Sequence, residues 1–488
     1  MEHVIGPIQG YFMEHDDGDT VFLLGFVIIA VFAFMALLTE FLSVSSEEEK
    51  ARSMKRCLAL VMFLIVNLFL PALGTAEDSY KFDLSETEKK PYHFGGYVEF
   101  KPVLFGLDHD SAFYKLRYFN DPQGQTQPEA NGRVQLEGSY EKDIYRLYVM
   151  TNTDLKYSDY AGSSEHSVFY EAYGSLKPSA SLKIDAGKKT MKWGKGYAWN
   201  PAAFVDRPKD PDEPELALEG FIVATADYIK SFDGPLKTFS FTPVVLPVYD
   251  HVNDAFGNNN KLNFAGRFYL LLYDTDIDLT FMTGGSRSDR YGMDFSRNIT
   301  TSFEIHGEYA YIRNARKTIL DASGNTRQVE ADAQSYLAGI RHLTTFDLTT
   351  IIEYYHNGTG FSDDELKNYF ASVNRAYNLY QSMGNAAALT SAKNLMDSGY
   401  GRFSAAKDYL YVRFSQKEPF DILYFTPALT WMMNLNDRSY TLTPELSYTG
   451  FTNWELRFRT AFLVGGQSTE FGEKQNDYRM ELRVGYYF

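Results

Sequence analysis

The stretch DYRMELRVGYYF, residues 477–488, decides the fold. Because successive residues of an extended strand point to opposite sides, this stretch has two faces of opposite character. Its apolar face holds Tyr478, Met480, Leu482, Val484, Tyr486 and Phe488, and its charged face holds Arg479, Glu481 and Arg483. In a soluble sandwich the apolar face would be the core, and in a membrane barrel it would face lipid.

The same alternation recurs along most of the chain beyond Glu77, for example over residues 133–140, 182–187, 303–309 and 454–459. Its segments are near ten residues long, which is the length of a transmembrane strand. The aromatic residue at the end of the last strand, Phe488, resembles the terminal signal that the barrel-insertion machinery reads in bacterial outer-membrane proteins. We therefore expect an all-β fold, a transmembrane antiparallel β-barrel in the outer membrane of a diderm bacterium.

Turn chemistry predicts the number of strands. Eight tight turns are expected at residues 141–143, 177–179, 233–235, 274–276, 298–300, 344–345, 417–419 and at Gly450. Long polar connections are expected between them, and in such barrels the short turns are periplasmic while the long loops are extracellular. Eight turns with a first and a last strand indicate about eighteen strands, and sixteen is the alternative because the region before Asn131 carries few turn signals.

Composition narrows the functional classes. The chain holds 36 Tyr and 38 Phe against 4 Trp, as aromatic belts at two membrane interfaces would require. A formal net charge of −16 argues against nucleic acid as a partner. The only cysteine is Cys57, and the nine histidines show no metal-ligand spacing, so we expect no cofactor and no metal.

Two apolar segments precede the expected barrel. Residues 21–38 are nearly long enough to span a bilayer as a helix. Residues 54–76 have the layout of a secretory signal peptide, since Lys55 and Arg56 precede an apolar run and a small-residue cleavage site. We expect residues 77–488 to form the mature barrel. Residues 1–53 are then either upstream of the true start at Met54 or a helix that is removed together with the signal peptide.

The third extracellular loop is expected over residues 191–218, between the fifth and sixth strands. Here the sequence from Lys192 to Gly220 reads KWGKGYAWNPAAFVDRPKDPDEPELALEG. The segment resembles one found in poorly characterised proteobacterial outer-membrane proteins. These are similar to the alginate-export and substrate-specific porin barrels, whose known members have eighteen strands. The resemblance implies a porin-like channel.

The chemistry of this loop suits a constriction inside the lumen. Gly194 and Gly196 permit unusual backbone angles, and four prolines stiffen the chain. We expect its aromatic side chains to stack on sugar rings and its charges to act at the narrowest point of the pore. The candidates are Trp193, Tyr197, Trp199, Asp206, Arg207, Lys209 and Asp210. The alternative is a loop that packs its aromatics over the rim. A second long loop, residues 358–406, has helical spacing over 363–396 and is expected either to cap the mouth or to lie solvated at the surface.

The lumen is expected to have two charged sides. Inward positions near the C-terminus and across the closing seam form a basic wall, namely Arg133, Arg146, Arg413, Arg457, Arg459, Arg479 and Arg483. An acidic wall on strands further round holds Glu304, Glu308 and Glu353. Such walls set up a field across the pore that attracts anionic solutes, or they pair with neighbouring side chains.

We therefore expect a channel for passive diffusion of small hydrophilic or anionic solutes, saccharides among them, rather than an enzyme. Its other partners would be outer-membrane lipid and the barrel-insertion machinery, and the sequence leaves its oligomeric state open. Two alternatives belong to other classes: a barrel sheath around a periplasmic electron-transfer or export partner, and an outer-membrane hydrolase. No Ser/His/Asp grouping is specific enough to name a nucleophile for the latter.

Overall fold

The computed structural model describes residues 91–321 and 323–488. The expected upstream segment 1–53, the expected signal peptide 54–76 and the first residues of the expected barrel lie outside this described part.

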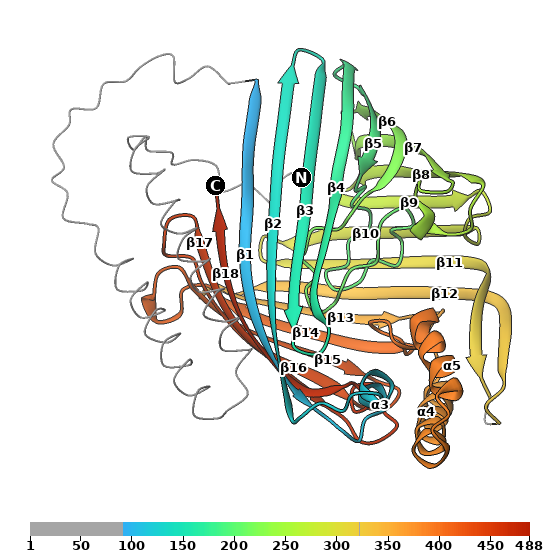
Figure 1. Cartoon of the computed structure of the whole chain (residues 1–488). Coiled ribbons are helices and arrows are strands. Elements are labelled where there is room, and N and C mark those ends of the chain that lie inside the picture. Colours follow the sequence, from blue (N-terminus) through green and yellow to red (C-terminus); the bar gives the residue numbers. More distant parts are fainter. Residues whose placement is uncertain (1–90, 322) are drawn as a thin grey trace. The chain divides into compact units, whose positions relative to one another are not determined.

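Eighteen strands form one closed antiparallel sheet, as the turn pattern predicts (Figure 1). Each strand pairs with its neighbours in sequence, and β1 pairs with β18 to close the barrel. The strands are β1 (Tyr92–Leu107), β2 (Thr126–Lys142), β3 (Tyr145–Ser158), β4 (Gly162–Ser179), β5 (Leu182–Lys189), β6 (Phe221–Ser231), β7 (Leu236–Val248), β8 (Lys261–Leu272), β9 (Thr275–Thr283), β10 (Arg290–Thr300), β11 (Phe303–Leu320), β12 (Thr326–Leu343), β13 (Leu348–His356), β14 (Asp408–Gln416), β15 (Phe425–Asn434), β16 (Tyr440–Tyr448), β17 (Trp454–Val464) and β18 (Asn476–Tyr487).

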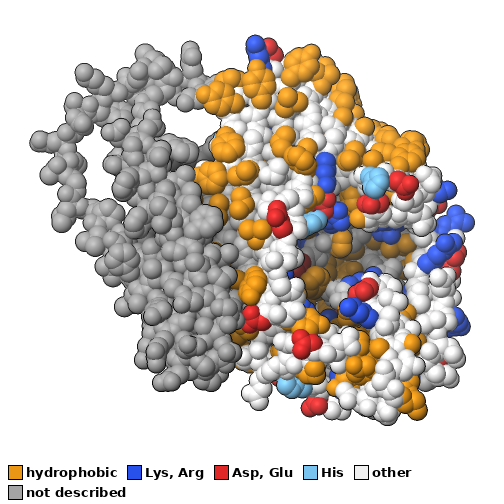
Figure 2. Space-filling model, viewed as in Figure 1, with side chains coloured by type: hydrophobic (Ala, Val, Ile, Leu, Met, Phe, Trp, Pro, Cys, Tyr) orange, Lys and Arg blue, Asp and Glu red, His pale blue; other side chains and the backbone are white. Residues whose placement is uncertain are grey.

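The barrel is apolar outside and polar inside. In β18, Met480 and Leu482 are 39% and 45% exposed, while Glu481 and Arg483 are 6% and 7% exposed. Hydrophobic side chains are scattered over the outer face of the strands (Figure 2). A water-soluble protein would bury the apolar set and expose the charges, so this distribution is that of a barrel surrounded by lipid.

All eight predicted tight turns join consecutive strands on one side of the barrel. The connections on the opposite side, called here the outer side, vary in length. Four of them have six residues or fewer, after β3 (residues 159–161), β9 (residues 284–289), β11 (residues 321–325) and β15 (residues 435–439). The other five are long, as expected. Two of these four short connections join the strands of long hairpins: β4, β11 and β12 have 18 residues each.

Helices gather on the outer side. They are α3 (Ala112–Tyr118), α4 (Asp363–Met383) and α5 (Ala387–Leu395), with single turns at Asp254–Phe256 and Met396–Tyr400. A further single turn, Pro419–Asp421, lies on the opposite side, in the connection between β14 and β15. Ser362 and Glu365 form a capping box that begins α4. The sequence predicted the second long loop as helical but gave no sign of α3. No described helix is long and apolar enough to cross a membrane.

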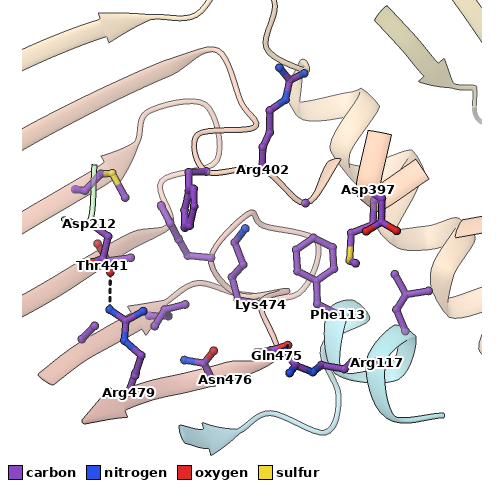
Figure 3. Close-up of a pocket in the computed structure, with 18 of the residues that line it drawn as sticks. Phe113, Arg117, Asp212, Asp397, Arg402, Thr441, Lys474, Gln475, Asn476 and Arg479 are labelled. Atoms are coloured by element: carbon purple, nitrogen blue, oxygen red, sulfur yellow. Dashed lines mark hydrogen bonds and ion pairs between the residues drawn. The ribbon is translucent and has the colours of Figure 1, made fainter. Parts of the chain in front are cut away.

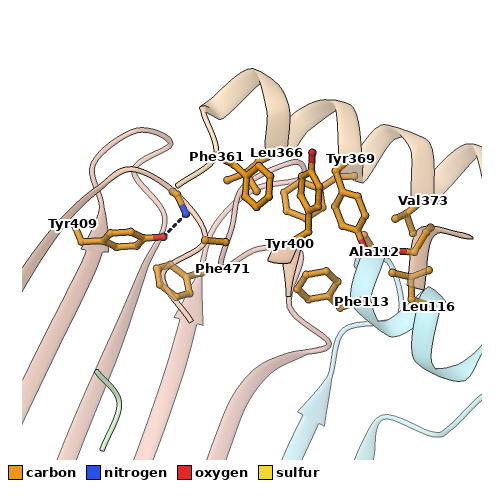
Figure 4. Packing of buried hydrophobic residues seen from close by; sticks show 14 of the residues in the cluster. Ala112, Phe113, Leu116, Phe361, Leu366, Tyr369, Val373, Tyr400, Tyr409 and Phe471 are labelled. Atoms are coloured by element: carbon orange, nitrogen blue, oxygen red, sulfur yellow. Dashed lines mark hydrogen bonds between the residues drawn. The ribbon is translucent and has the colours of Figure 1, made fainter. Parts of the chain in front are cut away.

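The helical loop joins a buried aromatic cluster rather than lying free in solvent (Figure 4). The ring of Tyr400 stacks on Phe361 at 3.9 Å and on Tyr369 at 4.3 Å between centroids. Phe113 of α3 packs edge-on against Tyr369 at 6.4 Å. The same cluster includes Trp199 of the third loop, so the helices and the third loop share one core.

Candidate functional site

The third loop is anchored first on the barrel wall formed by β11. Glu308 accepts hydrogen bonds from the backbone N–H groups of Lys195 and Gly196, both at 2.6 Å, and of Ala202 at 2.9 Å. Gly194 has φ +90°, and a Cβ there would stand 2.8 Å from the carboxylate of Glu308. The glycines that the sequence singled out therefore let the backbone close around this carboxylate.

A second carboxylate, on β13, continues the same anchor. Glu353 accepts hydrogen bonds from the backbone N–H groups of Tyr197 at 2.5 Å and of Ala198 at 2.9 Å. Its Oε1 also lies 2.8 Å from Nε2 of His306. Glu353 is 0% exposed, so its charge is met by these polar groups and not by bulk water.

The far end of the loop is anchored on the opposite, basic side of the lumen. Asp212 pairs with Arg459 and with Arg479, at 2.5 Å in each case. Glu213 pairs with Arg459 at 3.4 Å and with Arg483. The loop thus spans the lumen between two walls, with Pro211 and Pro214 stiffening the segment that carries the two carboxylates.

Electrostatics favour the ionised form of both loop carboxylates. Burial by itself would raise the pKa of Asp212, but Arg479 and Arg459 hold that pKa well below its ordinary value. The pKa of Glu213 is lowered in the same way, since burial is outweighed by Arg483, Lys101 and Arg459. The two anchors on the basic side are therefore charged across the physiological pH range.

The predicted basic wall is largely neutralised by partners. Within the wall, Arg459 pairs with Glu481 at 2.9 Å and Arg483 with Glu99 at 3.2 Å. The remaining members have these contacts: Arg413 to Glu445 at 3.0 Å, Arg457 to Glu455 at 2.5 Å, Arg133 to Asp154 at 2.7 Å, and Arg146 over the ring of Tyr148 at 5.6 Å. Of the acidic wall, Glu304 alone keeps partial exposure, at 27%. The electric field that we expected between the two walls therefore acts mainly on the charged groups of the third loop.

The two indoles of the loop are packed inside the protein. Trp193 is 2% exposed and belongs to a cluster with Phe204 and Val244. Trp199 is 5% exposed, stacks on Tyr355 at 5.0 Å and donates from Nε1 to Ser404 at 2.8 Å. Neither ring offers a free face to a sugar in this structure, contrary to the stacking expected from the sequence. Tyr197 is half-buried, and its hydroxyl donates to Glu215 at 2.8 Å.

Three of the four charged candidates, Asp206, Arg207 and Lys209, stabilise the loop itself. Asp206 accepts from the N–H groups of Met191 at 2.7 Å and Trp193 at 2.9 Å. Arg207 pairs with Glu219 at 2.6 Å. Lys209 donates from Nζ to the carbonyl oxygens of Gly196 at 2.6 Å and Tyr197 at 3.2 Å.

Asp210 is a candidate whose protonation changes near neutral pH. Its carboxylate accepts from the N–H of Asp212 at 2.9 Å. Burial and the negative charge of Asp212 raise the pKa of Asp210 to about 6. A group of this kind lets pH act on the loop.

Sequence reasoning left some contacts of the site out. Glu213 was not among the candidates, although the run Pro-Asp-Glu-Pro at 211–214 offers two carboxylates on a stiff segment to a wall of arginines. Lys195 was also missed, and its Nζ lies 3.0 Å from Asp278 of β9. The second contact carries no local signal, because Asp278 is distant in sequence.

Two cavities meet at the basic anchor. A cavity of about 670 Å³ on the outer side is lined by α3, the helical loop, the connection before β18 and the ends of β15 to β18 (Figure 3). A second cavity of about 280 Å³ lies along β1, β2, β3 and β18. Arg479 lines both cavities, and its partner Asp212 lines the larger one. The ion pair therefore borders the larger cavity, and its arginine also borders the smaller one.

No protein-family model matches the chain, and no curated protein is significantly similar to it. Solved structures with a similar fold include OpdQ of Pseudomonas aeruginosa, with a TM-score of 0.47, 10% identity and coverage of 81% of this chain and 97% of that one. For OccK5 (OpdH) of the same organism, the TM-score is 0.46 and the identity 13%, with coverage of 81% of this chain and 98% of that one. For a triple mutant of the Rhodopseudomonas blastica porin, the TM-score is 0.40 and the identity 10%, with coverage of 81% of this chain and 100% of that one.

The class of the chain follows from its own geometry. Only a closed barrel satisfies every backbone group of a membrane-spanning sheet, and only in lipid is an apolar outer surface around a polar interior stable. The eighteen paired strands and the exposed apolar face of β18 meet both conditions. The described residues therefore form a closed, eighteen-stranded β-barrel of the kind that spans a membrane.

Proposed function

We propose that this protein is a channel through which small hydrophilic solutes, anions among them, cross the outer membrane passively. The observation that carries the proposal is the position of Arg479, which lines both the outer cavity and the cavity beside β1 to β3. A solute that moved from one space to the other would pass the pair of Asp212 and Arg479. The third loop is then the constriction, held on both walls of the lumen.

The burial of Trp193 and Trp199 bears on which solutes pass. Because neither indole of the third loop has a free face, these two rings cannot serve as a stacking surface for saccharides. Its polar groups are arginines, lysines and carboxylates in ion pairs, which interact with charged and strongly polar solutes. Small anions therefore fit the passage better than stacked sugars do.

The sheath alternative makes a different demand on the lumen. A barrel that encloses a folded partner needs an interior wide enough for that partner. In this structure the third loop occupies the lumen between Glu308 and Arg459. A partner could enter only if the loop released both anchors, and that requirement favours the channel over the sheath.

Planar-bilayer conductance tests the proposal. Deleting residues 196–213 should raise the single-channel conductance, because the segment that narrows the pore is removed. The matched control is a deletion of residues 420–423, which are exposed in the connection between β14 and β15. Heat-modifiable migration on gels verifies that both barrels are folded. Unchanged conductance in the folded 196–213 deletion would contradict the constriction. No conductance in any variant without an added partner would favour the sheath, and hydrolysis of lipid or peptide would favour the hydrolase.

A further inference from the structure

The larger cavity, about 670 Å³, has an apolar lining with charges set into it. Its volume falls in the range that holds a drug-sized molecule. Its apolar side chains are Phe113, Leu116, Met396, Phe403, Met432, Ala461, Leu463 and Phe471. Such a lining binds the hydrocarbon body of a ligand by removing it from water.

Positive charge exceeds negative charge around this cavity. Its lining holds five cations, Arg117, Lys393, Arg402, Lys474 and Arg479, and two carboxylates, Asp212 and Asp397. Asp212 already pairs with Arg479. Among the residues that the structure describes, the other four cations have no carboxylate within 4.0 Å. An excess of this kind attracts an anion.

Lys474 is the cation best placed to meet that anion. Figure 3 shows its side chain reaching into the middle of the lining, beside Phe113. Its ammonium group lies 5.0 Å from the centroid of the Phe113 ring, and no carboxylate in the described residues forms an ion pair with it. Burial lowers the pKa of Lys474, and the charge of Glu470 opposes this only in part. A desolvated ammonium without an ion-pair partner gains from a ligand that brings negative charge.

We propose that this cavity is a binding site for a small amphipathic anion, which contacts Lys474 through its anionic group and Phe113, Phe471 and Met432 through its apolar body. Arg402 adds positive charge beside it, donating from Nε to the Gly399 carbonyl at 3.1 Å. The site deepens the proposed channel function and rests on it, because the bound anion would stand directly before the pair of Asp212 and Arg479.

Other ligand classes fit this cavity less well. A cation would be repelled by the excess positive charge. A neutral apolar molecule would fill the cavity but leave the ammonium of Lys474 further from water, which costs free energy. A small hydrophilic anion such as acetate would meet the charge but leave the apolar lining without a partner.

Calorimetry on the full chain, folded in detergent, tests the site with 4-phenylbutanoate and its neutral amide as probes. The anion should bind about tenfold more tightly than the amide, since one contact with a charged group is worth about that factor. Lys474→Met should weaken anion binding about tenfold and leave amide binding unchanged, while Lys474→Arg should retain it. Lys367→Met, which removes a half-exposed lysine on α4, is the matched control and should change neither.

Equal binding of the two probes, or full anion binding by Lys474→Met, would overturn the site. If Lys474→Met does not fold, Arg402→Met supplies a second variant with the same expected selective loss. The outcome separates this inference from the channel itself. Conductance without anion binding would refute the site and leave the channel, whereas anion binding without conductance would refute the channel and leave the site.

Discussion

The two anchors of the third loop use different chemistry. On the acidic side, Glu308 and Glu353 accept five hydrogen bonds from backbone N–H groups of residues 195–202. On the basic side, Asp212 and Glu213 form ion pairs through their side chains with three arginines of β17 and β18. The first anchor depends on the path of the loop backbone, and the second on two particular side chains.

The two anchors therefore hold the loop in different ways. Buried carboxylates that accept backbone N–H groups fix a local conformation, because each N–H would otherwise lose its partner. Ion pairs between side chains fix where a segment lies, because they depend on the positions of the two charged groups and not on the backbone conformation between them. We therefore expect the segment near Gly196 to stay folded when the segment near Asp212 is released, and not the reverse.

Breaking the backbone anchor should have the largest effect. Glu308→Ala leaves three buried N–H groups without a partner, at roughly 1–3 kcal/mol each. Opening of the loop should then become at least about a hundredfold more frequent. The rate of tryptic cleavage after Lys195, which Gly196 follows, measures this opening in the folded barrel. Glu304→Ala, which removes the same charge from the same strand, is the control, and cleavage no faster than in that control would show that Glu308 does not hold the loop.

Breaking the ionic anchor should have a smaller effect. Asp212→Ala removes the contacts to Arg459 and Arg479, but both arginines keep Glu481, at 2.9 and 3.5 Å. The expected cost is therefore about 2 kcal/mol, with higher conductance and little tryptic cleavage after Lys195. Asp364→Ala, an exposed carboxylate on α4, is the control.

The pH dependence of the ionic anchor provides a further test of how the two anchors differ. Because the pKa of Asp212 is lowered, its contribution is present above the ordinary carboxyl pKa and is lost only as the pH falls through the lowered value. Conductance of the wild type should show no step from this residue between about pH 5 and pH 8. If a step in that range persisted in Asp210→Asn and was absent when Asp212→Ala was added to that variant, Asp212 would not be held ionised by the arginines.

The same contrast explains what the sequence could predict. Strands carry a period of two, and the eight tight turns carry their own residue types, so the strand number and the inward side of Arg479 or Glu308 could be predicted. The backbone anchor could not, because its donors are N–H groups that every residue except proline has. Only the fold brings Lys195 to Glu308, 113 residues away.

The packed indoles show a second limit. Trp193 and Trp199 have the composition of a sugar platform, and the sequence cannot tell an exposed ring from a buried one. Burial is decided by side chains from distant strands, such as Val244 of β7 beside Trp193. The outer cavity is subject to the same limit, since Phe113 of the unpredicted α3 meets Lys474 there only in the folded barrel.

The smallest expected effect concerns Asp210, which lies between the two anchors. Its pKa is raised to about 6, so the folded loop disfavours its charged form. The stability that protonation supplies is therefore present at acid pH and is lost as the pH rises through about 6. Asp210→Asn should hold the loop in its low-pH form at neutral pH, with a gain of about 1 kcal/mol.

Conductance between pH 5 and pH 7.5 measures this effect. The wild type should show a modest rise with a midpoint near 6, and Asp210→Asn should show none. Asp364→Asn, which removes an equal charge from the exposed start of α4, should keep the rise. A rise that persisted in Asp210→Asn would assign the titration to another group. A rise that vanished there but remained in Asp212→Ala would show that Asp210 acts on the backbone-anchored half of the loop.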